Sequence, residues 1–208
     1  MSIIEYLVNN GIRLQTIEGG IYENDLHQQR QDLINIVSNL NPYSSVPIKN
    51  TLEIGFNAGT SSVLFLENNE NNTVTSFDLG EHNYIYKAQE YITNNYPGRH
   101  TLIVGDSRIT IPEYIKNNEN TKFDFIFIDG GHAYDVAKSD LDNCYKLAHE
   151  NTIVAIDDYT YTPGYSAGYT EGPTNAWNEF VNSNKIKEIN KKEYRIGRGM
   201  AWGIYQFT

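Results

Sequence analysis

Three carboxyl groups stand at the ends of two apolar runs in the second half of the sequence. Asp129 follows the run FDFIFI, and the adjacent Asp157 and Asp158 follow TIVAI. Carboxylates that share a partly dry cleft repel one another, so a cation is expected between them. Oxygen ligands without a cysteine favour magnesium, or calcium or manganese, over zinc. The pattern predicts a divalent-cation site formed by Asp129, Asp157 and Asp158.

His132 comes three residues after Asp129, in the sequence DGGH. An unperturbed imidazole titrates near neutrality, where a general base works efficiently. We therefore interpret His132 and Asp129 as catalytic residues, with His132 accepting a proton. The alternative is a histidine that caps a helix or supports a metal ligand from behind.

A glycine turn interrupts the stretch TLEIGFNAGTSSVLFL, which begins at Thr51. Glycine allows a ligand to approach the backbone closely, and the N–H groups that begin the following helix face whatever lies above the turn. The dinucleotide pattern GxGxxG is matched poorly, because only two glycines are present. The turn still predicts a nucleoside-bearing ligand, and the residues expected around it are Glu53, Gly55, Asn57, Ala58, Gly59 and Ser61.

Acidic residues also end the two apolar runs that follow the turn. Asp78 ends TVTSFD, roughly 20 residues after the turn, where a carboxylate can accept hydrogen bonds from ribose hydroxyls. Asp106 and Ser107 follow TLIVG. Each could simply cap a helix, but ligands of open parallel sheets bind beyond the carboxyl ends of the strands. We expect all three residues at the same site.

The elements that position these residues alternate from Asn50 onward. Predicted strands cover 51–54, 73–78, 100–105, 123–129 and 152–157, and predicted helices cover 60–67, 84–95, 111–116, 135–149 and 173–182. This alternation predicts a parallel sheet covered on both faces. Two strand-like runs at 185–191 and 202–207 predict an antiparallel hairpin at one edge. Helices are expected at 2–10 and 24–40, joined by a segment, 18–24, that is either a lid or a plain turn.

The composition limits the classes of partner that the protein is expected to bind. The 208 residues suit one domain, and a formal charge of -10 argues against nucleic acid as a partner, because such proteins need a basic face. One cysteine, Cys144, excludes an internal disulfide. The chain has no long apolar run and no signal-like start, so we expect a cytoplasmic protein without membrane contact.

The motif EIGFNAG, followed by Asp78 and by GDS at Gly105–Ser107, resembles the class I S-adenosylmethionine-dependent methyltransferases. The resemblance implies an α/β, Rossmann-like, doubly wound sheet of seven strands, mostly parallel with a reversed last strand, plus N-terminal helices. It implies one domain over 1–208, with 1–45 as a helical extension or lid. It also implies S-adenosylmethionine as the cofactor, held by the turn residues, Asp78 and Asp129, with Asp106 and Ser107 at the adenine.

The pattern DxxH followed by DD resembles the divalent-metal-dependent O-methyltransferases. Catechol methyltransferases place a lysine at the position of His132 and an asparagine at that of Asp158, so the likeness is closer to antibiotic deoxysugar O-methyltransferases of the macrolide-sugar type and to cephalosporin hydroxylase-like relatives. This implies magnesium-assisted methylation of a hydroxyl on a deoxysugar or nucleotide-linked sugar. The alternatives are a catechol or other phenolic methyltransferase, a non-catalytic S-adenosylmethionine-binding subunit, and a ribose-methylating RNA enzyme, for which no basic groove is found.

Tyrosines and glycines crowd the segment YTYTPGYSAGYTEGP, which begins at Tyr159. Tyrosine offers flat apolar area with a polar tip, which suits a sugar or an aromatic ring, although an ordinary surface loop is an equal alternative. The N-terminal helices are also candidates for a homodimer contact. The expected substrate residues are Tyr22, Tyr159, Tyr161, Tyr165 and Trp177.

Overall fold

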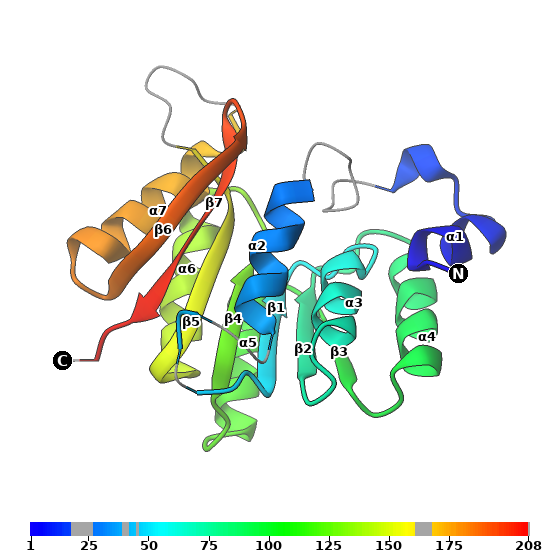
Figure 1. Cartoon of the computed structure of the whole chain (residues 1–208), viewed down its shortest axis with the longest axis horizontal. Helices are drawn as coiled ribbons and strands as arrows, with labels where there is room; N and C mark the ends of the chain where they lie inside the picture. Colours follow the sequence, from blue (N-terminus) through cyan, green and yellow to red (C-terminus); the bar gives the residue numbers. More distant parts are fainter. Residues whose placement is uncertain (18–26, 39–41, 45, 161–167, 208) are drawn as a thin grey trace.

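The computed structural model describes residues 1–17, 27–38, 42–44, 46–160 and 168–207 (Figure 1). The strands are β1 (Asn50–Ile54), β2 (Thr73–Asp78), β3 (His100–Val104), β4 (Phe123–Ile128), β5 (Ala148–Tyr159), β6 (Ile186–Arg195) and β7 (Arg198–Tyr205). The helices are α1 (Ile3–Asn9), the short 3₁₀ helix η1 (Leu14–Thr16), α2 (His27–Val37), α3 (Thr60–Glu67), α4 (Ile85–Asn95), α5 (Ser107–Asn117), α6 (Tyr134–Lys146) and α7 (Glu171–Asn182).

The seven strands form one sheet in the order β3-β2-β1-β4-β5-β7-β6. The first five strands pair in parallel, and β7 runs antiparallel to both β5 and β6. The last strand is therefore reversed and lies inside the sheet, and β6 forms the edge. The predicted Rossmann-like sheet of seven strands and its closing hairpin are confirmed.

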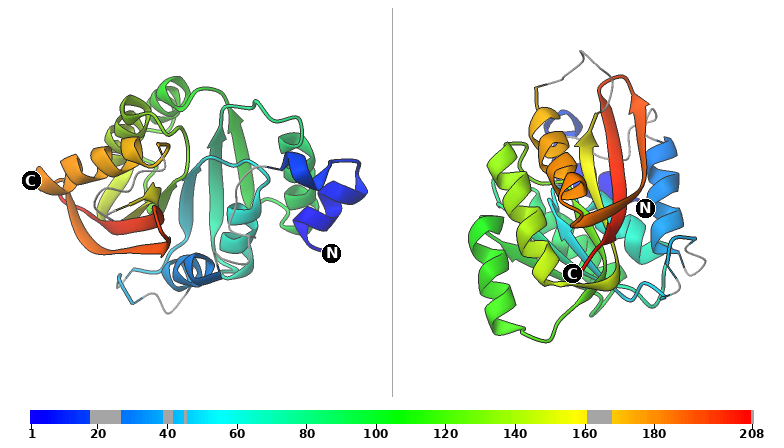
Figure 2. Two further views of the ribbon diagram at one scale, coloured as in Figure 1. Left: turned by 90° about the horizontal axis from the view of Figure 1, so that it is seen from above. Right: turned by 90° about the vertical axis from the view of Figure 1, so that its left-hand side faces the viewer.

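Two apolar layers hold helices on opposite faces of the sheet (Figure 2). Successive strand residues point to opposite faces, so Phe125 and Phe127 of β4 join the core under α1 to α4, while Ile126 and Ile128 join the core under α5 to α7. Phe65 of α3 packs edge-on against both phenylalanines, with ring centroids 5.5 and 5.7 Å away. Figure 1 shows α2 on the same face as α3, beside the β6–β7 hairpin.

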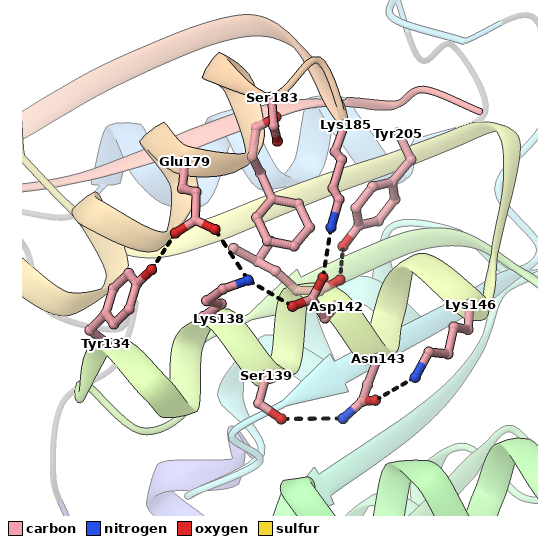
Figure 3. A network of polar contacts seen from close by, with 12 residues as sticks. Tyr134, Lys138, Ser139, Asp142, Asn143, Lys146, Glu179, Ser183, Lys185 and Tyr205 are labelled. Atoms are coloured by element: carbon pink, nitrogen blue, oxygen red, sulfur yellow. Dashed lines mark hydrogen bonds and ion pairs between the residues drawn. The ribbon is translucent and has the colours of Figure 1, made fainter. Parts of the chain in front are cut away.

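A chain of surface ion pairs joins α6 to α7 (Figure 3). Lys138 Nζ lies 2.9 Å from Asp142 and 3.2 Å from Glu179, and Lys185 Nζ lies 2.9 Å from the other oxygen of Asp142. These side chains are substantially exposed, so each pair adds little stability. The pairs link the outer surfaces of the two helices, while the apolar core beneath α5 to α7 supplies most of their packing.

Helices α5 and α6 differ from their predicted bounds by three or more residues at one end. Helix α5 begins at Ser107 instead of 111, because the Asp106 side chain accepts a hydrogen bond from the Arg108 N–H and caps the helix. The helix predicted over 135–149 ends at Lys146, and His149 belongs to β5, which begins four residues before its predicted start. His149 Nε2 lies 3.0 Å from Asp124, an ion-pair position that the helical pattern did not reveal.

Candidate functional site

The three predicted metal ligands converge at the carboxyl end of the sheet. Asp129 directly follows β4, and Asp157 and Asp158 lie near the end of β5. One carboxylate oxygen from each of Asp129, Asp157 and Asp158 lies within 4.8 Å of the other two. This is close enough for all three to share one cation.

A bulge in β5 allows two adjacent carboxylates to serve one site. In a regular strand, neighbouring side chains point to opposite faces. Here the register with β7 shifts between Ile156 and Tyr159, and Asp158 has a left-handed backbone with φ 56°. Such a conformation costs a non-glycine residue of order 1–3 kcal/mol and often marks a functional site. The bulge thereby brings Asp157 and Asp158 to the same cluster.

The cluster concentrates negative charge in a buried place. Burial, followed by repulsion from Asp158, raises the pKa of Asp157 to about 7, and burial together with the neighbouring carboxylates raises the pKa of Asp129 well above its usual range. Arg198 at the start of β7 lies 3.4 Å from Asp158 and 4.0 Å from Asp157, so one guanidinium offsets part of this charge.

The donor set fits a hard divalent cation. All three cluster ligands are carboxylate oxygens, the type that magnesium and calcium prefer. Oδ1 of Asp158 is buried and has no hydrogen-bond partner in the part of the chain that the structure describes. Arg198 Nε lies 3.4 Å from this oxygen, and a cation would add a direct contact and further positive charge.

His132 lies beside the carboxylate cluster, with its side chain about half exposed. Its Nε2 is 2.9 Å from Asp158 Oδ2, and this hydrogen bond raises the pKa of the imidazole. The ring centroid of Tyr169 lies 5.4 Å from that of His132. His132 contacts the carboxylate of Asp158, a predicted metal ligand, and it also lines the cavity. The geometry therefore suits either a catalytic base or a histidine that supports the metal ligand.

A cavity of about 490 Å³ opens between the glycine turn and this cluster. Asp129, His132 and Asp158 line one part of it, and the ends of β1, β2 and β3 line the rest. The predicted cofactor residues on its wall are Gly55, Asn57, Ser61, Asp78, Asp106, Ser107 and Asp129. The structure thus brings the glycine turn, the acidic strand ends and the carboxylate cluster around one space.

The turn after β1 needs its glycine for steric reasons. Gly55 has φ +94°, and a Cβ on it would lie 1.8 Å from the carbonyl oxygen of Asp129. Asn57 also has a left-handed backbone, and its N–H donates to Asp78 Oδ2 over 2.8 Å. The N–H of Gly80 donates to Asp78 Oδ1 over the same distance. The Asp78 carboxylate is therefore fixed at the cavity wall, with lone pairs left for ligand hydroxyls.

The start of α3 offers backbone donors to a ligand. Gly59 is the N-cap residue with φ 72°, and no side chain caps this helix. Helix N-termini bind anionic groups because their first N–H groups lack partners and carry partial positive charge. Thr60 and Ser61 of this first turn line the cavity, which suits the carboxylate of an amino acid.

Two predicted cofactor residues lie behind the cavity wall. Glu53 is fully buried and accepts hydrogen bonds from the hydroxyls of Ser61, Ser62 and Ser76. Burial raises the pKa of Glu53 to about 7. Ala58 is buried in the apolar core. The side chains of both residues support the turn from beneath it, and Gly59 contributes as the helix cap.

At the opposite end of the cavity, Asp106 is already engaged. Besides capping α5, its carboxylate is bonded to Arg108 Nη2 over 2.7 Å, and this hydrogen bonding lowers the pKa of Asp106. Arg108 and Ser107 line the cavity next to it. The part of the cavity wall formed by Asp106 and Ser107, the residues predicted at the adenine, thus also includes Arg108, which the sequence pattern does not single out.

The predicted substrate residues agree less well with the cavity than the predicted cofactor and metal residues do. Tyr159 is buried in the core with its hydroxyl 3.0 Å from Asn178, and Trp177 is buried with its Nε1 bonded to Glu188 over 2.9 Å. Neither residue lines the cavity, so their prediction as substrate contacts is wrong: each amphipathic ring serves the fold. Tyr22, Tyr161 and Tyr165 lie outside the described residues. From the predicted loop, Tyr169 does line the cavity.

Sequence reasoning missed two residues that contact the carboxylate cluster. The sequence pattern assigns Arg198 only to a hairpin and Gln29 only to a helix. In the structure Arg198 Nε lies 3.4 Å from Asp158, and Gln29 donates to Asp157 Oδ1 over 2.5 Å. Gln29 is 128 positions from its partner in the sequence. No local pattern marks either contact, because only the tertiary fold creates it.

The sheet order, the reversed β7 and a ligand cavity at the carboxyl ends of the parallel strands define a class I methyltransferase fold. Residues 52–159, just over half of the chain, match the family model described as a methyltransferase domain (Methyltransf_24), and the chain belongs to this family. The protein is therefore an S-adenosylmethionine-dependent methyltransferase, and the predicted enzyme class is confirmed. No curated protein sequence matches the chain.

Several solved structures share the fold. An O-methyltransferase from Bacillus cereus in complex with SAH has a TM-score of 0.73 at 16% identity, covering 99% of this chain and 91% of its own. TomG from Streptomyces achromogenes, an O-methyltransferase involved in tomaymycin synthesis, was solved with SAM and has a TM-score of 0.73 at 13% identity, covering 100% and 91%. CalS11, a TDP-rhamnose 3'-O-methyltransferase of calicheamicin biosynthesis, has a TM-score of 0.65 at 15% identity, covering 97% and 90%.

No described helix has the length and apolar character needed to cross a bilayer.

Proposed function

We propose that this methyltransferase is a divalent-cation-dependent O-methyltransferase whose acceptor is a hydroxyl of a deoxysugar or nucleotide-linked sugar. The observation that carries the proposal is the meeting of Asp129, Asp157 and Asp158 beside the cavity that the glycine turn lines. Magnesium, or another divalent cation, is the proposed second cofactor. The acceptor is proposed to be a small molecule.

Each part of the site has its own role in this proposal. The N-terminus of α3 receives the amino-acid end of S-adenosylmethionine, and Asp78 accepts hydrogen bonds from its ribose hydroxyls. Asp129, Asp157 and Asp158 hold the cation. When bound, the cation supplies Lewis-acid chemistry that lowers the pKa of an acceptor hydroxyl, which is otherwise a poor nucleophile toward a sulfonium methyl group. His132 opens to the same cavity and takes the proton from that hydroxyl.

Sugar as the acceptor class has two supports. The DxxH and DD pattern resembles deoxysugar O-methyltransferases, and CalS11, named as a TDP-rhamnose 3'-O-methyltransferase, shares the fold. The cavity wall also carries groups that bind polar ligands: Arg198, His132 and the ring of Tyr169. A vicinal diol on a sugar could reach a cation at this wall, and a catechol could do the same, so both belong in one screen.

The test is methyl transfer from labelled S-adenosylmethionine to a panel of nucleotide-sugars and catechols, with magnesium or with a chelator. We expect transfer to a sugar that needs magnesium, and we expect Asp157→Asn to abolish this transfer while S-adenosylmethionine binding by calorimetry persists. Asp142→Asn, which removes a surface carboxylate of the α6–α7 ion pairs, is the matched control. Undiminished methyl transfer in the presence of the chelator would refute the proposed cation dependence. Transfer to catechols alone would refute a sugar as the acceptor.

A further inference from the structure

Helix α2 presents polar side chains toward the protein interior. Gln29 and Asp32 are buried together with Leu33, Ile36 and Val37. Residues three apart share one side of a helix, so Gln29 and Asp32 form a polar end to an otherwise apolar inner face. Buried polar groups are retained where they find specific partners. Each of the two contacts a different part of the protein.

Asp32 anchors α2 to the edge hairpin. Its two carboxylate oxygens lie 2.8 and 2.9 Å from Lys192 Nζ, and the hydroxyl of Tyr194 donates to it over 3.0 Å. Lys192 and Tyr194 both belong to β6. None of these three hydrogen bonds reaches a carboxylate of the cluster.

Gln29 reaches the cluster itself. Its Nε2 donates to Asp157 Oδ1 over 2.5 Å, and the whole residue is inaccessible to solvent. This bond fixes the rotation of the Asp157 carboxylate and leaves Oδ2, the oxygen that faces Arg198, for other partners. A group that orients a metal ligand from behind commonly changes metal affinity when it is removed.

The other half of the Gln29 amide is unsatisfied. Oε1 is buried and has no hydrogen-bond partner among the described residues. Because Oε1 and Nε2 are bonded to the same carbon, this oxygen lies one amide group's width from the atom that donates to Asp157. A buried amide oxygen without a donor costs of order 1–3 kcal/mol, so its retention points to a donor that arrives with a ligand. Magnesium usually keeps several waters, and their O–H groups are such donors.

We propose that Gln29 is a positioning residue of the cation site: its N–H fixes Asp157, and its carbonyl oxygen accepts a hydrogen bond from a water molecule that enters with the cation. Cation binding and docking of α2 then stabilise each other. This inference rests on the cation site proposed above, and it adds a residue from a helix far away in the sequence.

The experiment measures Mn²⁺ binding and amide hydrogen exchange of residues 27–37, with and without Mn²⁺. Gln29→Met keeps the length and removes the amide, and Asp32→Asn weakens the other anchor of the same helix. In the wild type, Mn²⁺ should slow exchange in α2. Gln29→Met should weaken Mn²⁺ binding about 10–100-fold and abolish this slowing. Asp32→Asn should exchange faster in both states; because Gln29 and the apolar face still hold α2 docked most of the time, it should keep the wild-type Mn²⁺ affinity and the slowing.

Three results would overturn the inference while the cation site stands. These are an α2 exchange rate that ignores Mn²⁺ in the wild type, an unchanged affinity in Gln29→Met, and an equal loss of affinity in both variants, which would assign the effect to helix docking in general. The wild-type exchange measurement decides even where a variant folds poorly. A wild-type chain that binds S-adenosylmethionine but no Mn²⁺ would instead overturn the cation site, and the role of Gln29 with it.

Discussion

Replacing Glu53 by glutamine should stabilise the protein in a way that depends on pH. Glu53 is inaccessible to solvent under the glycine turn, where three serine hydroxyls donate to it. Burial outweighs these hydrogen bonds and raises the pKa of the carboxyl from 4.5 to about 7. The folded state therefore prefers the protonated carboxyl more strongly than the unfolded state does.

The sign and size of the effect follow from linkage. Because the folded pKa is the higher one, the stability contributed by Glu53 is complete below pH 4.5 and is lost as the pH rises through about 7. At pH 8 the ionised wild type should carry a penalty of about 3 kcal/mol. Glutamine has the same shape and no charge, so it avoids this penalty. Rearranging the serine hydroxyls around an amide costs about 1 kcal/mol at either pH.

The assay is urea unfolding of the wild type and of Glu53→Gln at pH 5 and pH 8. The gain in free energy of unfolding from the substitution should be about 2–3 kcal/mol larger at pH 8 than at pH 5. Taking the difference between the two pH values cancels the pH-independent cost of the amide. Glu70→Gln, which removes an exposed carboxyl, is the control for the change in net charge. An equal effect at both pH values, or a larger gain at pH 5, would refute the reasoning.

Two further substitutions test the cavity. Gly55→Ala places a Cβ 1.8 Å from the Asp129 carbonyl oxygen, so it should lower Tm and abolish S-adenosylmethionine binding measured by calorimetry. Gly98→Ala is the control for backbone strain, because Gly98 also has a positive φ but a Cβ there would meet nothing within 4 Å. Equal effects of the two substitutions would contradict the steric argument. His132→Ala should slow methyl transfer by roughly 10²–10⁴ with Mn²⁺ binding retained; a loss below tenfold would leave His132 a supporting role.

Local sequence patterns were enough to place the strands and most helices. The helix at Thr60–Glu67 and the strand at Thr73–Asp78 have the predicted bounds, because an apolar run between polar or glycine breaks is a local signal. The same logic placed Asp78 and Asp129 at strand ends. The composition of the tyrosine-rich segment did not place Tyr159 and Trp177 correctly. A tyrosine or tryptophan side chain can contact either a ligand or the protein core, and composition alone does not distinguish these two roles.

By itself, the sequence determined the fold class, the glycine turn and the set of carboxylates at the strand ends, since these depend on short-range periodicity and on the common direction of parallel strands. The tertiary structure alone decided that a left-handed Asp158 turns two neighbouring acids to one site, and that Gln29 and Arg198 meet them there. These contacts join segments far apart in the chain. Their existence depends on how α2 and the β6–β7 hairpin pack, which no local pattern encodes.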